Sequence, residues 1–293
     1  SLSNDHTSSA QTVLPLNISC DASELIEGGD FTEFASNGSM EADSNWAQFG
    51  SPTTEEQSST RSHSGTYSWY IAHAAQRKGI QSTQWVATAG EKYTVSAWIY
   101  ATDGTEILSG INNTTETIYG THTVTEDAWT HITYVTTVTT TASTYVGFFT
   151  SDSTQDFYVD DVSVVKGGWT LGAGWTTGNG IATHAAGSAT GMDYSFLFKN
   201  GKTYDITFDV LSCSGGSGSV QARGSGSTVS QAIDGTTLGA NTFRYTDNDD
   251  HNVLRIYAES GTTMSIDNVS VKEVSPLATG FSTRKINSSY TGK

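Results

Sequence analysis

The sequence contains two copies of one strand pattern, and this repeat limits what the chain can fold into. GEKYTVSAWIY at residues 90–100 matches GKTYDITFDVL at 201–211, with Tyr93 opposite Tyr204 at an offset of 111. In both segments apolar and polar residues alternate with period two, which is typical of a strand with one buried face. The sequence therefore predicts the same strand in each half of the chain.

A second matched pair lies near the end of each half. FYVDDVSVVK at 157–166 matches TMSIDNVSVKE at 263–273, and Asp160 lies opposite Asp267 at an offset of 107. The two offsets differ by four residues, so the halves differ by a net change of that length. Self-similarity at a nearly constant offset indicates a duplicated domain.

The alternation also predicts which side chains of the matched strands face the core. In the first copy the inward residues are Tyr93, Val95, Ala97 and Ile99, and the outward residues are Thr94, Ser96, Trp98 and Tyr100. In the second copy the inward residues are Tyr204, Ile206, Phe208 and Val210, and the outward residues are Thr203, Asp205, Thr207 and Asp209. Each matched strand is therefore expected to cover a core with one face.

Short alternating runs continue through both halves, and helical periodicity is nearly absent. Turn-rich stretches such as TDGT, SGGSGSG and DNDDHN separate the runs, since Gly, Asn and Asp suit tight turns. This spacing predicts an all-β protein with two antiparallel β-sandwich (jelly-roll) domains in tandem. The predicted segments are an N-terminal arm or linker at 1–22, a first domain at 23–166, a smaller second domain at 167–275, and a C-terminal tail at 276–293.

The charge of the chain excludes some partners. Its 14 basic and 30 acidic residues give a formal net charge of −16. Nucleic acids are bound through clusters of Lys and Arg, so we expect no nucleic-acid partner. No apolar run approaches the roughly 20 residues that cross a bilayer, so we expect no membrane insertion. The composition is that of an exposed, extracellular surface.

Motifs for catalysis are missing from the sequence. It has no G-x-S-x-G, no H-E-x-x-H, no Walker-type loop and no Cys/His zinc spacing. The seven His residues are scattered along the chain, and no carboxylate pair stands out as a glycosidase dyad. We therefore expect a protein that is not an enzyme.

The order of motifs in the first half resembles a known family. LIEGGDFTEF at 25–34, HSGTYSW at 63–69, GEKYTVSAWIYA at 90–101 and FYVDDVSVV at 157–165 resemble the jelly-roll carbohydrate-binding modules beside cellulases and xylanases, which have the galactose-binding-like fold. In the second half, GWTLGAGWTTGNGIATHAAG at 168–187 and SIDNVSVKEV at 265–274 resemble the shorter modules of this fold in tailed-phage fibre and virion proteins. FSTRKINSSYTG at 281–292 looks like the start of a further module of phage structural proteins.

The resemblance implies a surface that binds sugar. Modules of this family stack aromatic rings on the apolar face of a pyranose and bind its hydroxyl rim with amides, carboxylates and Arg. The implied residues of the first domain are Trp46, Trp69, His73, Gln81, Trp98 and Tyr100. Those of the second domain are Asp209, Arg223, Arg255 and Tyr257. A Trp in a sandwich can also belong to the core, so that alternative stays open for each ring.

The family also carries a structural calcium ion, which ties the N-terminal strand to the last strand through about six to eight oxygen ligands. The resemblance implies Asp160 and either Asp30 or Glu33 as ligands in the first domain. Thr32 follows Phe31 at a position where the family usually has an acid. The second domain lacks the opening motif, so a second calcium site is less expected there.

Three functions remain open. The first is a non-catalytic glycan-binding protein of a virion appendage or capsid decoration, a fibre-like adhesin that contacts a host polysaccharide at the virion surface or outside the cell. Such a protein would be a homo-oligomer among other virion proteins. The second is an accessory carbohydrate-binding region of a secreted polysaccharide-degrading enzyme. The third is a structural assembly protein without sugar binding.

Overall fold

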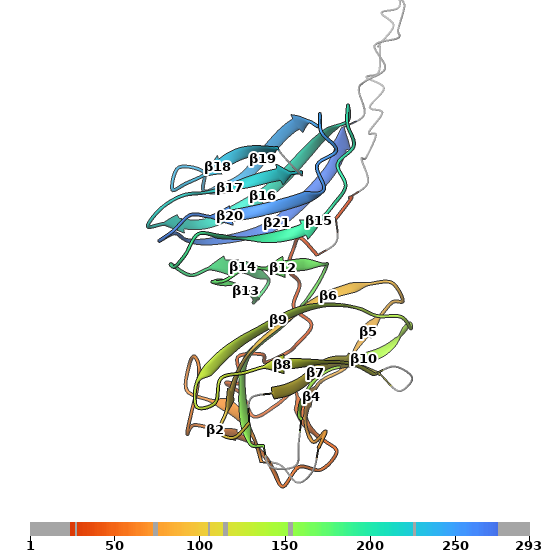
Figure 1. The fold of residues 1–293 in the computed structure, drawn as a ribbon, viewed down its shortest axis with the longest axis vertical. Coiled ribbons are helices and arrows are strands. Elements are labelled where there is room, and N and C mark those ends of the chain that lie inside the picture. The colour runs from red at the N-terminus through yellow and green to blue at the C-terminus, as the bar shows by residue number, and fades with distance from the viewer. Residues whose placement is uncertain are drawn as a thin grey trace, which may run out of the picture.

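The computed structural model describes residues 24–26, 28–72, 76–104, 106–113, 117–151, 155–224 and 227–274. These residues form β-strands, turns and irregular segments, and no helix is found among them. The strands make four antiparallel sheets, two in each half of the chain (Figure 1). The predicted all-β fold is therefore confirmed.

Domain one consists of two sheets from the first half of the chain. The first has the order β1-β4-β10-β7-β8, with β5 also paired to β10; its strands are β1 (Trp46–Phe49), β4 (Gly79–Ser82), β5 (Trp85–Ala87), β7 (Glu106–Asn112), β8 (Thr117–Thr123) and β10 (Ala142–Thr150). The second has the order β2-β3-β11-β6-β9; its strands are β2 (Thr54–Ser58), β3 (Ser68–Ala72), β6 (Lys92–Ala101), β9 (Trp129–Thr137) and β11 (Phe157–Lys166).

Domain two repeats this arrangement with ten strands. One sheet has the order β12-β15-β20-β17-β18, from β12 (Trp169–Leu171), β15 (Thr190–Ser195), β17 (Gly218–Arg223), β18 (Thr228–Ile233) and β20 (Val253–Ala258). The other has the order β13-β14-β21-β16-β19, from β13 (Trp175–Gly178), β14 (Ile181–His184), β16 (Thr203–Ser214), β19 (Gly239–Thr246) and β21 (Thr263–Val274). Strand β21 therefore takes the place of β11, and β16 that of β6.

The matched strands bury the faces that their alternation predicts. The four inward residues of β6, from Tyr93 to Ile99, are at most 1% exposed and lie in the core of domain one. The four inward residues of β16, from Tyr204 to Val210, are at most 2% exposed and lie in the core of domain two. Burial of these apolar faces, at about 25 cal/mol per Å², is the main force that holds each sandwich together.

The N-terminal segment 24–31 belongs to domain two rather than domain one. Glu24 pairs with Lys272 of β21, and the Leu25 amide donates to the Val271 carbonyl at 3.0 Å. The Phe31 side chain is fully buried in the core of domain two, with its ring centroid 5.6 Å from that of Trp169.

Segment 33–40 repeats the same contacts on domain one, nine residues later in the chain. Glu33 pairs with Val165 of β11, and the Phe34 amide donates to the Val164 carbonyl at 2.8 Å. Met40, which stands nine residues after Phe31, is fully buried in the core of domain one. ELIEGGDF at 24–31 and EFASNGSM at 33–40 are thus the opening elements of two different domains.

A close backbone approach explains one glycine in each opening element. The Gly29 carbonyl accepts from the Val269 amide at 2.7 Å, and a Cβ on Gly29 would lie 1.7 Å from the Val269 carbonyl oxygen. The Gly38 carbonyl accepts from the Val162 amide at 2.8 Å, and a Cβ there would lie 1.9 Å from the Val162 oxygen. Only glycine fits such positions.

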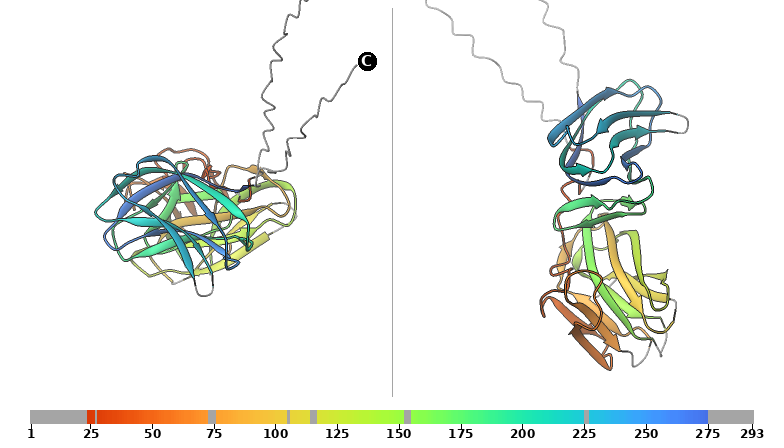
Figure 2. Two further views of the ribbon diagram at one scale, coloured as in Figure 1. Left: turned by 90° about the horizontal axis from the view of Figure 1, so that it is seen from above. Right: turned by 90° about the vertical axis from the view of Figure 1, so that its left-hand side faces the viewer.

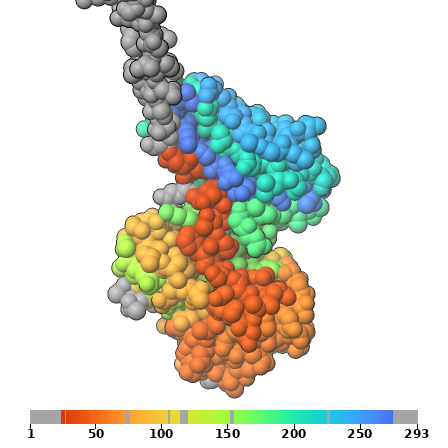
Figure 3. Space-filling model, turned by 180° about the vertical axis from the view of Figure 1, so that it is seen from behind, coloured from red at the N-terminus to blue at the C-terminus, as the bar shows by residue number. Residues whose placement is uncertain are grey.

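Domain one is therefore inserted between the first element of domain two and the rest of that domain. Figure 3 shows the N-terminal segment passing from one domain onto the other across their junction. The sequence places 24–31 in domain one because strand periodicity identifies a buried face but not the sandwich that buries it. The opening motif that the second half lacks is supplied by residues 24–31.

The two sandwiches join end to end (Figure 2). Strand β13 packs against β11, and the Ser163 and Thr177 hydroxyls lie 2.9 Å apart across this contact. The Thr94 hydroxyl lies 3.0 Å from the Gly167 carbonyl oxygen and 2.8 Å from that of Trp169. Domain two therefore covers one end of the outer face of the β2-β3-β11-β6-β9 sheet. The other end of this face is not covered by domain two.

Candidate functional site

Two of the predicted sugar-stacking rings lie in the core of domain one. Trp46 is 7% exposed, and its indole Nε1 donates to the Asn37 carbonyl at 3.0 Å. Trp69 is 3% exposed, and its Nε1 donates to a Glu55 carboxylate oxygen. Both rings are held by hydrogen bonds inside the fold, so neither offers a face to a ligand, and these two expectations are corrected. His73 lies outside the described residues.

Trp98 and Tyr100 project from the outer face of β6 and belong to a larger group of rings. Tyr100 is in register with Tyr158 of β11 on one side and with Trp129 of β9 on the other. Tyr70 of β3 continues the row, since its ring centroid lies 4.8 Å from that of Tyr158. We call these five side chains the aromatic face.

A connection between β2 and β3, the 59–67 loop, lies on the aromatic face. The His63 ring is stacked on the Trp98 indole at a centroid distance of 3.8 Å and an interplanar angle of 12°. The Arg61 guanidinium carbon lies 4.3 Å from the Tyr100 ring centroid, a cation–π contact. Tyr100 and Tyr158 are buried beneath this contact, whereas Trp98 and Trp129 remain partly exposed.

Asp160 and Asp161 hold the loop from below. Asp161 has a positive φ of 46°, and the β6–β11 register shifts between Asp160 and Ser163, so a bulge turns both carboxylates toward the loop. Asp160 accepts from the backbone amides of His63 (2.8 Å) and Ser64 (3.2 Å). Asp161 contacts the His63 ring nitrogen Nδ1 (2.6 Å) and accepts from the Ser64 hydroxyl (2.7 Å).

Burial shifts several ionisation equilibria at this face. Burial, followed by the neighbouring Asp161 charge, raises the pKa of Asp160 to about 7 against the three backbone donors that favour its charged form. Burial, followed by the nearby His63, lowers the pKa of His131. Burial also raises the pKa of Tyr70 to about 12, and its hydroxyl donates to Asp156 at 3.0 Å.

Domain two shows that the fold does not require these rings. The repeat places Asp209 and Leu211 at the positions of Trp98 and Tyr100, and the pairing of Asp267 with Asp209 reproduces that of Asp160 with Trp98. Ser265 stands at the position of Tyr158. The same sheet thus forms without outward aromatic residues.

The loop is also specific to domain one. The hairpin β13–β14 takes the place of β2–β3 and is closed by two residues, Asn179 and Gly180, whose positive φ values of 53° and 77° suit a tight turn. The corresponding connection in domain one has nine residues, 59–67. Rings and loop therefore occur together in one copy of the fold and are both absent from the other.

Gln81 lies on the other sheet of domain one, on the outer face of β4 next to Gly147 of β10. The neighbouring Phe49 and Phe149 rings on this face are 4.8 Å apart, and Phe149 is fully buried. The sandwich core separates Gln81 from Trp98, so the two predicted residues do not form one site.

The predicted residues of domain two divide between its two sheets. Arg223, Arg255 and Tyr257 project from the outer face of β17 and β20, as their alternation with buried residues predicts. The Arg255 guanidinium binds both carboxylate oxygens of Asp193, at 2.5 Å each. Asp209 lies on the opposite sheet, where it accepts from the Asn268 side-chain amide at 2.7 Å.

The three carboxylates expected to bind calcium do not converge. Asp30 lies against domain two, where its carboxylate accepts from the Thr32 hydroxyl at 2.8 Å. Glu33 accepts from the Val164 amide at 2.6 Å, and burial raises its pKa. Asp160 is committed to the 59–67 loop. Among the described residues no group of three or more His, Cys, Asp or Glu has the arrangement of a metal site, so the three expected ligands are not brought together in one cluster.

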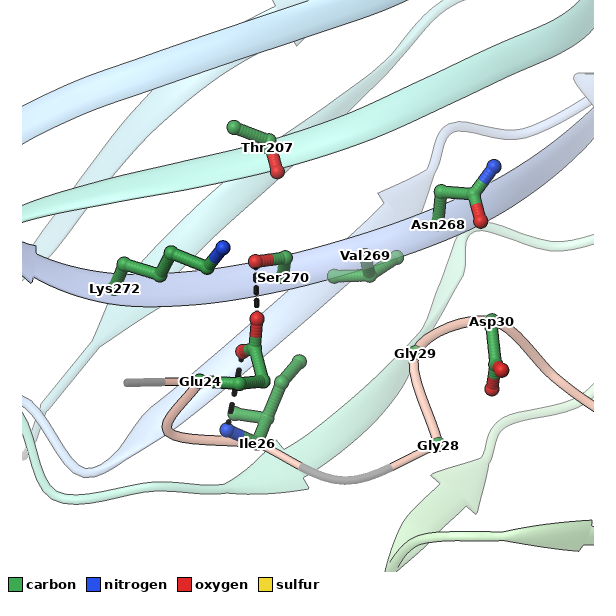
Figure 4. A pocket seen from close by; sticks show the side chains of 10 residues that line it. All are labelled: Glu24, Ile26, Gly28, Gly29, Asp30, Thr207, Asn268, Val269, Ser270 and Lys272. Carbon is green, nitrogen blue, oxygen red and sulfur yellow. Dashed lines mark hydrogen bonds between the residues drawn. The ribbon is translucent and has the colours of Figure 1, made fainter. Parts of the chain in front are cut away.

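A groove of about 470 Å³ lies between segment 24–30 and strands β16 and β21 (Figure 4). Figure 4 shows Glu24 directed at Ser270, whose hydroxyl donates to its carboxylate, while Thr207 and Lys272 project beside it. Ten residues of the described part of the chain line the groove, and none of these ten is aromatic. It lacks the ring that a sugar face would stack on and belongs to the attachment of the N-terminal segment.

A buried polar chain in domain two has the residue types of a hydrolase triad. His251 is fully buried, its Nδ1 contacts Asp247, and its Nε2 lies 3.0 Å from the Ser227 hydroxyl. The Ser227 hydroxyl also donates to the Asp249 carboxylate, which competes for the proton that a base would remove. Because the imidazole is inaccessible and a second carboxylate binds the hydroxyl, we interpret this hydrogen-bonded group as a structural link between two loops.

The sequence predictions did not include three members of the aromatic face, Tyr70, Trp129 and Tyr158, or three residues that contact it, Arg61, His63 and His131. The alternating WTHITYVTT at 129–137 carries a signal for two of them, because Trp129 and His131 share one strand face. No periodicity marks Arg61 or His63, since both lie in a loop.

No helix in the described part of the chain is long and apolar enough to cross a membrane.

Comparison with known proteins gives structural neighbours only. No protein-family model matches the chain, and no curated protein matches it. The tandem CBM22-1–CBM22-2 domain of Paenibacillus barcinonensis Xyn10C covers 88% of this chain and 100% of its own, with 12% identity and a TM-score of 0.39. The C-terminal family 22 carbohydrate-binding module of Clostridium thermocellum Xyn10B covers 48% and 95%, with 18% identity and a TM-score of 0.38.

A third neighbour, TmCBM61 in complex with β-1,4-galactotriose, covers 45% of this chain and 97% of its own, with 14% identity and a TM-score of 0.33. The structural neighbours are therefore jelly-roll carbohydrate-binding modules, single and in tandem. The likeness concerns the fold alone, and function has to be argued from the residues of this chain.

Proposed function

We propose that this protein is a non-catalytic glycan-binding protein and that its aromatic face contacts the sugar. The observation that carries the proposal is the difference between the two copies of the fold. Domain one places rings at outward strand positions where domain two has Asp209, Leu211 and Ser265. The corresponding sheet of domain two thus forms without such rings, and outward aromatic groups on one sheet are typical of a binding surface.

The chemistry of the aromatic face suits a sugar. A pyranose has an apolar C–H face, which stacks on Trp or Tyr, and a rim of hydroxyls, which needs donors and acceptors. Trp98 and Trp129 supply partly exposed rings. Asp161, which contacts the His63 ring stacked on Trp98, supplies a carboxylate. Arg255, Asp193 and Tyr257 would offer a second, smaller polar surface on domain two.

We further propose that the protein is part of a virion appendage or capsid decoration, outside the cell, and that it binds host polysaccharide there. The tandem modules support this role, because a second sugar contact on domain two, at Arg255 and Tyr257, would raise the effective concentration of ligand at the aromatic face. The resemblance of the second half and of 281–292 to phage structural modules points the same way. Other virion proteins and further copies of this chain would be its partners.

A glycan array with matched variants tests the proposal. Trp98→Ala and Trp129→Ala should each weaken glycan binding about 2- to 10-fold, which is the range of a lost aromatic contact. Leu211→Ala is the control, because Leu211 lies on the corresponding strand of domain two, which lacks the rings, and is 50% exposed. If the protein were instead the accessory region of a polysaccharide-degrading enzyme, the array should show a preference for plant cell-wall glycans. If it were an assembly protein without sugar binding, no glycan on the array should bind.

A further inference from the structure

The 59–67 loop occupies the positions that a ligand of the aromatic face would take. The His63 ring is parallel to the Trp98 indole and 3.8 Å above it, which is the geometry of a ring stacked on a Trp platform. The planar Arg61 guanidinium covers Tyr100 in the same way at 4.3 Å. A sugar that stacks on either ring must first move the loop.

The loop is attached by bonds that water or a ligand can replace. Beyond the last β2–β3 pair, Ser58 with Ser68, its attachments are the two ring contacts described above and a set of polar bonds, among them the Asp160 and Asp161 contacts and the bond from the Ser68 hydroxyl to the Arg61 carbonyl. Exchange of such bonds for bonds to water has a small net cost.

The composition of the loop also favours local opening. Residues 61–66 read RSHSGT and contain no aliphatic side chain, and all except Ser62 are exposed. Segments with few buried apolar contacts open at a lower free energy than the sheet beneath them. Glu41 accepts from the Thr66 and Tyr67 amides, at 2.8 and 2.9 Å, and so fixes the C-terminal end about which the loop would turn.

We propose that the 59–67 loop is an intramolecular cap, which a glycan displaces from Trp98 and Tyr100. This inference rests on the proposed function, and it adds that the free protein is largely in a closed state. The measured association constant is then the intrinsic association constant multiplied by the fraction of molecules whose loop is open. The short Asn179–Gly180 turn leaves domain two without such a cap.

Hydrogen exchange followed by NMR tests the cap without any ligand. The His63 and Ser64 amides, which donate to Asp160, should exchange at least about 100-fold faster than the amides of Ile99 and Val159 in the sheet below. Equal protection of the loop and sheet amides would mean that the loop opens only when domain one unfolds, and the proposal would be overturned.

Binding measurements test displacement by a sugar. His63→Ala removes the ring that covers Trp98 and should tighten binding of the glycan found on the array about 2- to 10-fold. Ser62→Ala changes the same loop without touching a ring and should leave the affinity unchanged. Weaker binding by His63→Ala would make His63 part of the binding surface and refute the cap. Absence of binding in every variant would refute the proposed function, while the exchange rates still report on the loop.

Discussion

The insertion of domain one into domain two can be tested with two equivalent substitutions. Phe31 and Met40 both have no exposed surface and occupy the same position in the two opening elements, with φ values of 47° and 58°. Phe31 lies in the core of domain two and Met40 in the core of domain one. Phe31→Ala should therefore destabilise domain two and Met40→Ala domain one.

The size of each effect follows from the deleted volume. Truncation of a buried Phe costs about 3–5 kcal/mol and truncation of a buried Met about 2–5 kcal/mol, because the cavity that remains collapses only in part. Since about 1.4 kcal/mol is a factor of ten, Phe31→Ala should raise the unfolded population of domain two by roughly a hundred- to several-thousand-fold. Each variant serves as the control for the other, because both keep the same backbone conformation.

Hydrogen exchange with mass spectrometry reports on the two domains separately. Phe31→Ala should lower the protection of peptides from β16 and β21 more than that of peptides from β6 and β11, and Met40→Ala should do the reverse. The reasoning would be refuted if Phe31→Ala deprotected domain one and spared domain two. Such a result would mean that residues 24–31 belong to domain one, which follows them in the chain.

Three further predictions concern single contacts. Burial raises the pKa of Asp160 in the folded protein to about 7, from an ordinary 3.8. Its contribution to the unfolding free energy therefore declines as pH rises from about 4 to about 7, by at most about 4 kcal/mol. Asp160→Asn should remove this part of the pH dependence of the unfolding free energy, measured by urea denaturation across the same pH range. Gly29→Ala should lower the melting temperature of domain two, and Gly178→Ala, with no atom within 4 Å of its added Cβ, should leave it nearly unchanged. Arg255→Lys should lose the bidentate contact with the partly exposed Asp193 but cost no more than about 1 kcal/mol of unfolding free energy, which a denaturation midpoint would show; a larger cost would indicate a desolvated pair.

Some features of the aromatic face could be predicted from local sequence and others could not. Trp98 and Tyr100 alternate with buried residues of β6, so their outward orientation follows from period two alone. Trp69 alternates in the same way, but the partner that fixes its role, Glu55, lies on another strand. A Trp that faces the core and one that faces solvent are not distinguished by residue type.

The three predicted calcium ligands failed to meet for a related reason. The resemblance places the opening motif at 25–34 and assigns it to one domain. In the structure this stretch spans two opening elements, so Asp30 lies against domain two while Glu33 lies against domain one. Two acids three residues apart were thus separated by the boundary between two sandwiches, which no spacing in the sequence marks.

The sequence by itself determined the duplicated all-β fold and the buried face of each matched strand, because alternation along a strand is a local property of the backbone. The tertiary structure decided which domain residues 24–31 complete and what lies on Trp98. Those outcomes depend on contacts such as Glu24 with Val271 and His63 with Asp160, which join residues 247 and 97 positions apart. Contacts of this kind follow from how whole sheets pack, and the residues that make them carry no periodic signal of their own.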